Sequence, residues 1–567
     1  MKLLNQRMKA EMERCKDVAR SEGLQFDDNT LEYIVSNRDM LELKPKIMIP
    51  TLYDYWVHDV GAIRNRWIYD VYPNNPYETV INTRPAMSFY NQDNTDWFNV
   101  MIFYHVLGHI DYFQNNIYSR NTWDDDFAGQ ALADKRLINR IRDELDTERR
   151  WVDYVIEFSR AIDNLVGYYP ELKETDKKDY PEMFGLVSER VDYYFGQFLQ
   201  ERYEDGQVDL NFYHKEIDRL NKFTQRLGEE EGEKAFFEDL RLRGKFPEFG
   251  DVFKKWKKKE NKPMPKDIFE YLWENSSVLN DEDNLWMKDV MQVIRRTSLY
   301  FQPQMRSKIA NEGWASFWHE RLFIQDEHIE GHEVDYSIVN SGVTASPRVG
   351  LNPYATGMKL FEFIEELGRK GRLSREYQLL DRIEDRRNYD SGGGEAAGKE
   401  ALFAARKYLN DEGLIDFLSE KDFQDFVDKN KLFIAGIRPH RDPYKWDRAE
   451  VYIKSRDGEE YRKLLKEQLY HPPNIKINEK KAYDFEVELY LDHIYEGKAL
   501  VEKYIEPALR GLEFLAGGPV VLETTEYEEV YPSDWWEWHE WGYEPKHRMI
   551  RVVYICEDGY VFRDELY

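Results

Sequence analysis

The chain has 567 residues, a length that suits two to four domains with substantial hydrophobic cores. Hydrophobic residues make up 42% of the chain, aromatic residues 15% and charged residues 33%, and this composition excludes a globally disordered protein. The formal net charge of -28 disfavours nucleic-acid binding, because an acidic surface repels phosphates unless basic residues gather on one face.

Cysteine content and hydropathy indicate a protein of the cytoplasm. Cys15 and Cys556 are the only cysteines and lie almost a full chain apart, which excludes a disulfide framework or a cysteine-rich zinc site. No stretch approaches 18 consecutive apolar residues, and the amino-terminal residues lack the apolar core of a signal peptide. We therefore expect a cytoplasmic protein without a membrane span.

The spacing of apolar residues predicts a mostly helical first part. Residues 1–45 are expected to form one or two amphipathic helices, because apolar residues recur there at three- and four-residue spacing. Residues 46–96 are dense in Pro, Asn and Tyr, which predicts loops and short strands. Helical periodicity then holds from about 96 to 240, returns at 266–330, and predicts a further helix at 357–370.

The pattern changes towards the carboxyl end. Residues 371–429 are expected to form a helical connector with a glycine-rich turn. Residues 430–567 alternate β-branched runs such as AEVYIKS and PVVLETT with helical segments, and they include a hairpin turn at Asp558–Gly559 and a Trp-rich tail. The predicted fold class is α+β: a large, mostly helical body with its core at 46–370, followed by a smaller mixed α/β domain.

Two histidines four residues apart form the first candidate site. His105 and His109 lie in the segment YHVLGHIDYF, where a helix would place both imidazoles on one face, about 6 Å apart at their Cβ atoms. This spacing suits two ligands of one metal ion. Histidines at this spacing are also common in packed cores, so the pair alone leaves both interpretations open.

A second predicted helix supplies an acidic candidate. The segment KIANEGWASFWHERLF carries Glu312 and, two turns later, His319 on the same face. A carboxylate among so many apolar side chains is costly to bury unless a cation or hydrogen bonds compensate. The string N-E-G-W-A resembles the N-E-G-x-A helix of gluzincin metallopeptidases, whose Glu is the third zinc ligand. The resemblance implies a site of His105, His109 and Glu312; the alternative is that Glu312 only caps or braces a helix.

The helix with the two histidines lacks the general base of zinc peptidases. H-E-x-x-H places Glu directly after the first His, where this chain has Val106, and the inverted order H-x-x-E-H needs Glu in place of Gly108. Our candidates for moving protons are therefore Glu78 and His319. Glu78 could instead be structural, and His319 could be a fourth ligand or a hydrogen-bond partner of a ligand.

Four segments in order resemble the SpoVR family (stage V sporulation protein R): YETVINTRP, YHVLGHIDYFQNN, YFQPQMRSKIANEGWASFWH and LNPYATGMKLFEFIEE. The likeness is clearest from about residue 45 to 370 and weaker to about 525. It implies a role in formation of the spore cortex. It also implies a serine protein kinase and a von Willebrand-A-like protein as partners, since members are often encoded beside both. The chain departs from the family at Val57-His58-Asp59, where members usually have Ser-Phe-Gly-Lys.

These features together predict a metal-dependent hydrolase of amide or peptide bonds. His105, His109 and Glu312 would bind a divalent ion, zinc in the first place and iron or manganese as alternatives. A cell-wall precursor or cross-linked wall peptide is the substrate that the family context implies. Two alternatives stay open: a non-catalytic regulatory or scaffold protein that acts with the kinase complex, and an oxidoreductase, because His₂-carboxylate sites also hold iron.

Overall fold

The computed structural model divides the chain into two compact units, residues 1–172 with 267–567, and residues 173–266. The four segments expected from the sequence are not tested by this division and stay predictions. The structure describes residues 2–37, 39, 78–120, 127–165, 189–194, 198–199, 202, 210–239, 244–260, 267–345, 351–380, 382–439, 449–469, 473–495, 499–530 and 546–566. Val57-His58-Asp59 and the tryptophans of the Trp-rich tail lie outside these ranges.

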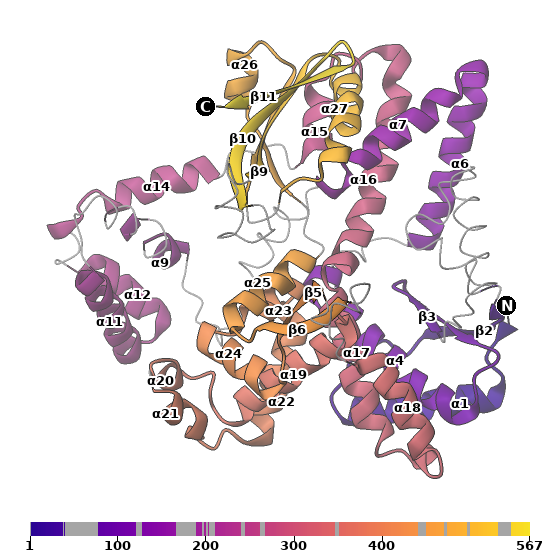
Figure 1. Cartoon of the computed structure of the whole chain (residues 1–567), viewed down its shortest axis with the longest axis vertical. Coiled ribbons are helices and arrows are strands. Elements are labelled where there is room, and N and C mark those ends of the chain that lie inside the picture. The colour runs from indigo at the N-terminus through magenta and orange to yellow at the C-terminus, as the bar shows by residue number, and fades with distance from the viewer. Residues whose placement is uncertain are drawn as a thin grey trace. The chain divides into compact units, whose positions relative to one another are not determined.

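The larger unit has a predominantly helical body accompanied by small sheets, so the predicted α+β class is confirmed (Figure 1). Its helices are α1 (Gln6–Ser21), α4 (Asp96–Asn115), α5 (Ile117–Arg120), α6 (Phe127–Leu145), η2 (Asp146–Glu148), α7 (Arg150–Ala161), η3 (Asp163–Leu165), α15 (Ile268–Asn275), η6 (Glu282–Asn284), α16 (Leu285–Arg306), α17 (Lys308–Phe323), η7 (Glu327–Ile329), α18 (Glu333–Thr344), α19 (Pro353–Arg369), α20 (Arg375–Gln378), α21 (Ile383–Asn388), α22 (Gly394–Tyr408), α23 (Asp411–Asp416), α24 (Glu420–Lys429), α25 (Gly458–Gln468), α26 (Glu479–Asp484) and α27 (Glu502–Ala516).

A four-stranded sheet lies at the amino end of this unit. Its strands, in spatial order, are β1 (Lys2–Leu3), β2 (Thr30–Val35), β4 (Ala86–Asn91) and β3 (Glu78–Ile81). The helix expected within residues 1–45 is present as α1, but the expectation of helix was wrong for β2. The six residues TLEYIV are mostly β-branched or aromatic, and they pair along their whole length with β4 in parallel.

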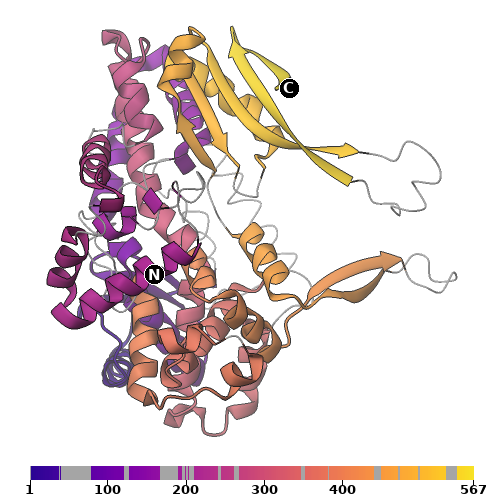
Figure 2. The same cartoon turned by 90° about the vertical axis from the view of Figure 1, so that its left-hand side faces the viewer.

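The carboxyl-terminal part contains a five-stranded sheet and a separate two-stranded one. In spatial order the larger sheet has β11 (Tyr560–Leu566), β10 (Lys546–Glu557), β9 (Val520–Val530), β8 (Leu489–Ile494) and β7 (Asn474–Ile477), and the smaller pairs β5 (Ile434–Pro439) with β6 (Ala449–Ser455). β9 and β10 are the long yellow strands of Figure 2. The predicted hairpin is confirmed, since Asp558 and Gly559 connect β10 to β11 with φ of 52° and 76°.

Helix α4 runs through the largest hydrophobic core of the unit. Every residue from Phe98 to Phe113 is buried, as expected for a helix that is apolar on all sides. Side chains of α1, α17, α19, α22, α23 and α24 share this core. Residues 371–429 therefore contribute directly to the packing around α4, and residues 394–400, expected in a glycine-rich turn, form the first turns of α22.

Small residues set how closely α17 approaches its two neighbours. Gly108 of α4 faces Ala315 of α17, where an added Cβ would lie 2.8 Å from the Ala315 Cα. On the other side, an added Cβ at Gly357 of α19 would lie 2.7 Å from the Cα of Gly313. Since real Cβ atoms do not approach other atoms so closely, α17 is held between α4 and α19 by contacts that only small residues permit.

The first turn of α17 is capped by a side chain from another helix. Ser307, the residue before α17, makes no capping bond. Instead, Oδ1 of Asp411, the first residue of α23, accepts a hydrogen bond from the backbone N–H of Ala310 at 2.8 Å. This bond satisfies one of the free N–H groups of the helix start and fixes the first turn of α17 just before Glu312.

The smaller unit is helical and has a core of its own. Its helices are α9 (Glu189–Tyr193), α11 (Leu210–Leu227), α12 (Glu229–Glu238) and α14 (Phe249–Glu260). The core is largely aromatic and includes Tyr194, Phe198, Phe236, Phe237 and Phe249. Across the described part of both units, every helix is too short or too polar to cross a lipid bilayer.

Candidate metal centre

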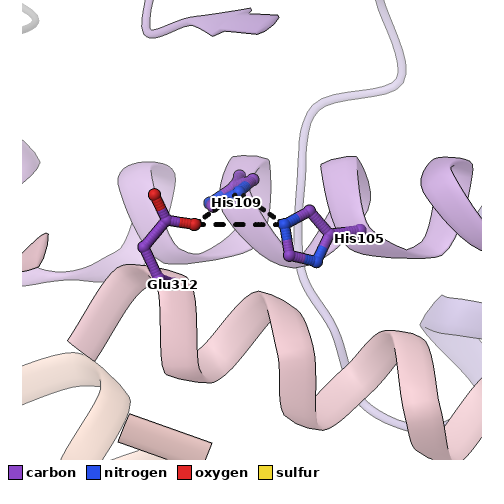
Figure 3. Close-up of side chains that lie close together, drawn as sticks. All are labelled: His105, His109 and Glu312. Atoms are coloured by element: carbon purple, nitrogen blue, oxygen red, sulfur yellow. Dashed lines mark hydrogen bonds and ion pairs between the residues drawn. The ribbon is translucent and has the colours of Figure 1, made fainter. Parts of the chain in front are cut away.

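Helices α4 and α17 bring the three predicted ligands together (Figure 3). The Nε2 atoms of His105 and His109 lie 3.1 Å apart, and Oε2 of Glu312 lies 4.0 Å from the first and 3.5 Å from the second. All three ligand atoms fall within 4.8 Å of one another, which is close enough for one ion to contact them all. The group could therefore bind a metal ion, as the sequence predicts.

The other ring nitrogen of each histidine has a partner. Nδ1 of His109 lies 3.0 Å from Oδ1 of Asn311, the residue before Glu312. Nδ1 of His105 lies 3.0 Å from Nδ1 of His319, whose Nε2 lies 3.0 Å from Oδ1 of Asn340 on α18. Histidines that bind metals commonly have such a partner on the second nitrogen, because it fixes the orientation of the ring.

Burial keeps the imidazoles of the group uncharged. It lowers the pKa of His105 well below the ordinary value of 6.5, with a further lowering from neighbouring His109 and His319. It also lowers the pKa of His109, and that of His319 to about 4. The rings are therefore neutral at neutral pH, which is the form that binds metals.

The pKa of Glu312 changes in the opposite direction to the pKa values of the histidines. Burial raises the pKa of its carboxyl group to about 7, although a hydrogen bond from Tyr354 and the charge of Lys308 oppose the change. Its side chain keeps 19% exposure, yet the Oε2 atom that faces the histidines is buried and has no hydrogen-bond partner among the residues that the structure describes. An unsatisfied buried oxygen costs free energy, and a cation at this position would remove that cost.

Tyr354 is a site residue that the sequence reasoning missed. Pro353 is the first residue of α19, and Oδ1 of Asn352 accepts from the backbone N–H of Tyr354 at 3.0 Å. The hydroxyl group of Tyr354 bonds to the carboxylate of Glu312, and its ring stacks on that of His105 at 6.3 Å between centroids. The segment LNPYATG, with its helix start, could have indicated a tyrosine next to the site.

The two candidates for proton transfer lie near the group but not within it. Glu78 is the first residue of β3, and its charge raises the pKa of both His109 and Tyr354, so it lies within electrostatic reach of the site. His319 is buried beside His105. Helix α4 itself has no room for a base at Gly108, because Ala315 packs against that position.

Comparisons with known proteins cover all of these residues. The sequence matches the family described as SpoVR like protein over residues 3–471. It is also similar to the uncharacterized protein YcgB of Escherichia coli (strain K12), with 24% identity over 409 residues, 69% of this chain and 68% of YcgB. No solved structure matches the chain. The family match includes all three candidate ligands and ends before β7, so the five-stranded sheet lies outside it.

Proposed function

This chain belongs to the SpoVR-like protein family, and we propose that it is a metal-dependent hydrolase of amide or peptide bonds. His105, His109 and Glu312 would hold one divalent ion. The observation that carries the proposal is the buried Oε2 of Glu312, which faces two ring nitrogens and has no hydrogen-bond partner in the described part of the chain. Two histidines and one glutamate are the ligands of many catalytic zinc sites, where a fourth position stays open for water.

The nature of the ligands limits the choice of metal. Two imidazole nitrogens and one carboxylate oxygen suit zinc first, and iron or manganese as alternatives. When bound, such an ion polarises a substrate carbonyl and lowers the pKa of a coordinated water towards 7. The low exposure of the two histidines, 6% and 7%, strengthens this electrostatic effect, because little water screens the site.

The residues around the group support distinct roles in this reaction. Tyr354 donates a hydrogen bond to Glu312 and so orients the carboxylate of the third ligand. We assign Glu78 as the general base, because α4 carries no base of its own and the charge of Glu78 acts on both His109 and Tyr354. The likeness to sporulation proteins makes wall peptides the first substrates to assay.

Metal analysis of the purified chain tests the proposal. We expect about one divalent ion per chain after incubation with zinc. We also expect a loss of affinity of more than about 100-fold in His105→Ala and Glu312→Gln, since each removes a direct ligand. Glu333→Gln, at an exposed position in the first turn of α18, is the matched control and should bind as the wild type does.

Hydrolysis of wall peptides and model amides is then measured with the same proteins. Turnover should disappear in Glu312→Gln and fall strongly in Glu78→Gln, while the metal content of Glu78→Gln stays near that of the wild type. The proposal is wrong if the wild type retains no ion after incubation with zinc, iron(II) or manganese.

A further inference from the structure

We propose that Asn340 and Glu320 are positioning residues of the metal centre, which fix the hydrogen positions on His319 and thereby present a free lone pair of His105 to the ion. This inference rests on the proposed function and deepens it. It assigns His319 as the hydrogen-bond partner of a ligand, and it adds two residues from outside the metal group. A chain of hydrogen bonds runs inward from Glu320 to His105.

The carboxylate of Glu320 determines how the side-chain amide of Asn340 is oriented. Oε2 of Glu320 accepts a hydrogen bond from Nδ2 of Asn340 at 2.7 Å. Glu320 borders an open groove on α17 and α19. Because a carboxylate oxygen accepts hydrogen bonds, the NH₂ group of Asn340 points at Glu320, and its Oδ1 points at His319.

The orientation of Asn340 in turn fixes the hydrogen of His319. Oδ1 of Asn340 lies 3.0 Å from Nε2 of His319 and can only accept, so Nε2 carries the ring hydrogen. A neutral imidazole has one N–H group, so Nδ1 of His319 has a free lone pair. That Nδ1 lies 3.0 Å from Nδ1 of His105, which must therefore be the donor.

The hydrogen on Nδ1 of His105 determines which of its nitrogens can bind a metal ion. With its hydrogen on Nδ1, His105 has a free lone pair on Nε2, the atom that faces Nε2 of His109 and Oε2 of Glu312. A lone pair on this atom is the requirement for metal binding. The hydrogen-bonded chain Glu320–Asn340–His319–His105 thus prepares the first ligand before any ion arrives.

The chain is needed because a competing acceptor lies beside both rings. The backbone carbonyl of Ala315, one turn before His319, is within hydrogen-bonding reach of His105 and of His319. Without Asn340, His319 could carry its hydrogen on Nδ1 and donate to that carbonyl. His105 would then face an N–H group and would have to keep its own hydrogen on Nε2, which blocks coordination.

The test compares zinc affinity and the cobalt(II) absorption spectrum among variants of the full chain. Asn340→Ala should bind zinc about 10-fold to 100-fold more weakly, as expected when the partner of a ligand histidine is lost, and should alter the visible bands of bound cobalt. Asn340→Asp combined with Glu320→Ala should bind nearly as tightly as the wild type, because it keeps an oxygen that accepts from His319 and has no second carboxylate beside that oxygen. Ser341→Ala, the next residue of α18 and exposed, is the matched control.

A double-mutant comparison separates positioning from a general structural effect. Glu320→Ala should weaken zinc binding in the wild-type background, because Asn340 can then rotate. It should instead strengthen zinc binding in the Asn340→Asp background, because it removes the repulsion between two carboxylates and leaves an oxygen that accepts from His319. An equal loss in both backgrounds would overturn the inference, and this comparison decides the matter even if Asn340→Ala does not fold.

Two further outcomes are distinguishable. Wild-type affinity and an unchanged cobalt spectrum in folded Asn340→Ala would overturn the positioning role and leave the proposed hydrolase untouched. Failure of the wild type to bind zinc or cobalt at all would overturn both the proposed function and this inference.

Discussion

Two largely buried carboxylates, Glu312 near the start of α17 and Asp326 just beyond its end, differ in how well their hydrogen bonds are satisfied. Burial alone would raise the pKa of both carboxyl groups. In Asp326, hydrogen bonds from Arg14, Tyr104 and His328 outweigh the effect of burial, and the pKa falls to about 2. Glu312 has one hydrogen-bond donor, Tyr354, and its pKa rises to about 7. A carboxylate with its hydrogen bonds satisfied stabilises the fold, whereas an unsatisfied one is suited to binding a cation.

The pKa of Asp326 predicts a pH-dependent contribution to stability. Its carboxyl group has a lower pKa when folded than the ordinary 3.8, so it stabilises the fold above about pH 4, and this contribution is lost as the pH falls towards 2. Asp326→Asn should lower the free energy of unfolding by on the order of 1–2 kcal/mol at pH 7. Urea denaturation at several pH values should show the difference shrinking between about pH 4 and pH 2.

Asp416→Asn is the control for this measurement. Asp416 pairs with Lys466 at 2.6 Å, but both side chains are largely exposed, at 43% and 37%. A surface pair contributes little, so this variant should lose at most about 0.5 kcal/mol. A constant difference between Asp326→Asn and the wild type from pH 7 to pH 2 would contradict the assigned pKa.

At the scale of residues, the sequence predicts the ligand candidates and one possible partner, His319, but not Asn340 or Tyr354. His105 and His109 are four residues apart on one helix, and the motif around Glu312 is a local string, so both are visible in the sequence. Asn340 reaches His319 only because α18 packs beside α17, and nothing in its local sequence marks it. Hydrogen bonds between helices depend on packing that periodicity does not encode.

At the scale of elements, the string N-E-G-W-A is explained by the neighbours of α17. Gly313 permits the close approach of α19, and Ala315 packs against Gly108 of α4. Trp314, between them, is fully buried, and its Nε1 donates to Asp111 of α4 at 2.8 Å. These contacts fix α17 between α4 and α19 next to Glu312, so the motif describes a helix crossing as well as a candidate ligand.

This crossing predicts an unusual response to alanine. Gly357→Ala should lower the free energy of unfolding by about 1–3 kcal/mol, because the new Cβ would collide with the backbone of α17. It should also weaken zinc binding, since Tyr354 and Glu312 would separate. Denaturant unfolding and zinc titration of the purified variant measure both effects.

Gly342→Ala provides the matched control on α18. No atom lies within 4 Å of the added Cβ there, so the change should stabilise the helix by up to about 1 kcal/mol, the difference in helix propensity. Equal stability of the two alanine variants would show that the α17–α19 contact is looser than the structure indicates.

The sequence predicts helices well where apolar residues keep the three- and four-residue spacing of a helix. The expected helix at 308–323 coincides with α17, and that at 357–370 nearly coincides with α19. The prediction failed at β2, where a short strand follows a helix and each residue pairs with a β4 residue 56 positions further along the chain. Such a strand is stabilised by a distant partner, so local spacing is a weak guide to it.

At the scale of the whole molecule, the two compact units have separate hydrophobic cores. The core around α4 contains the candidate metal group, whereas the aromatic core of residues 173–266 has no residue of that group. A ligand that binds only the folded larger unit should stabilise that unit by mass action and leave the other unchanged. The units should therefore respond differently to metal.

Differential scanning calorimetry of the full chain tests this expectation. We expect two transitions, of which only one moves to higher temperature with zinc. At a free zinc concentration 100 times the dissociation constant, the stabilisation should be about 2.7 kcal/mol. Chelator should reverse this shift, and Glu312→Gln should abolish it. Phe236→Ala, which removes a fully buried ring from the aromatic core, should lower only the zinc-insensitive transition. If zinc moved both transitions equally, or if Phe236→Ala lowered the zinc-sensitive one, the units would be folding as one cooperative body and the separation of their cores would have no thermodynamic consequence.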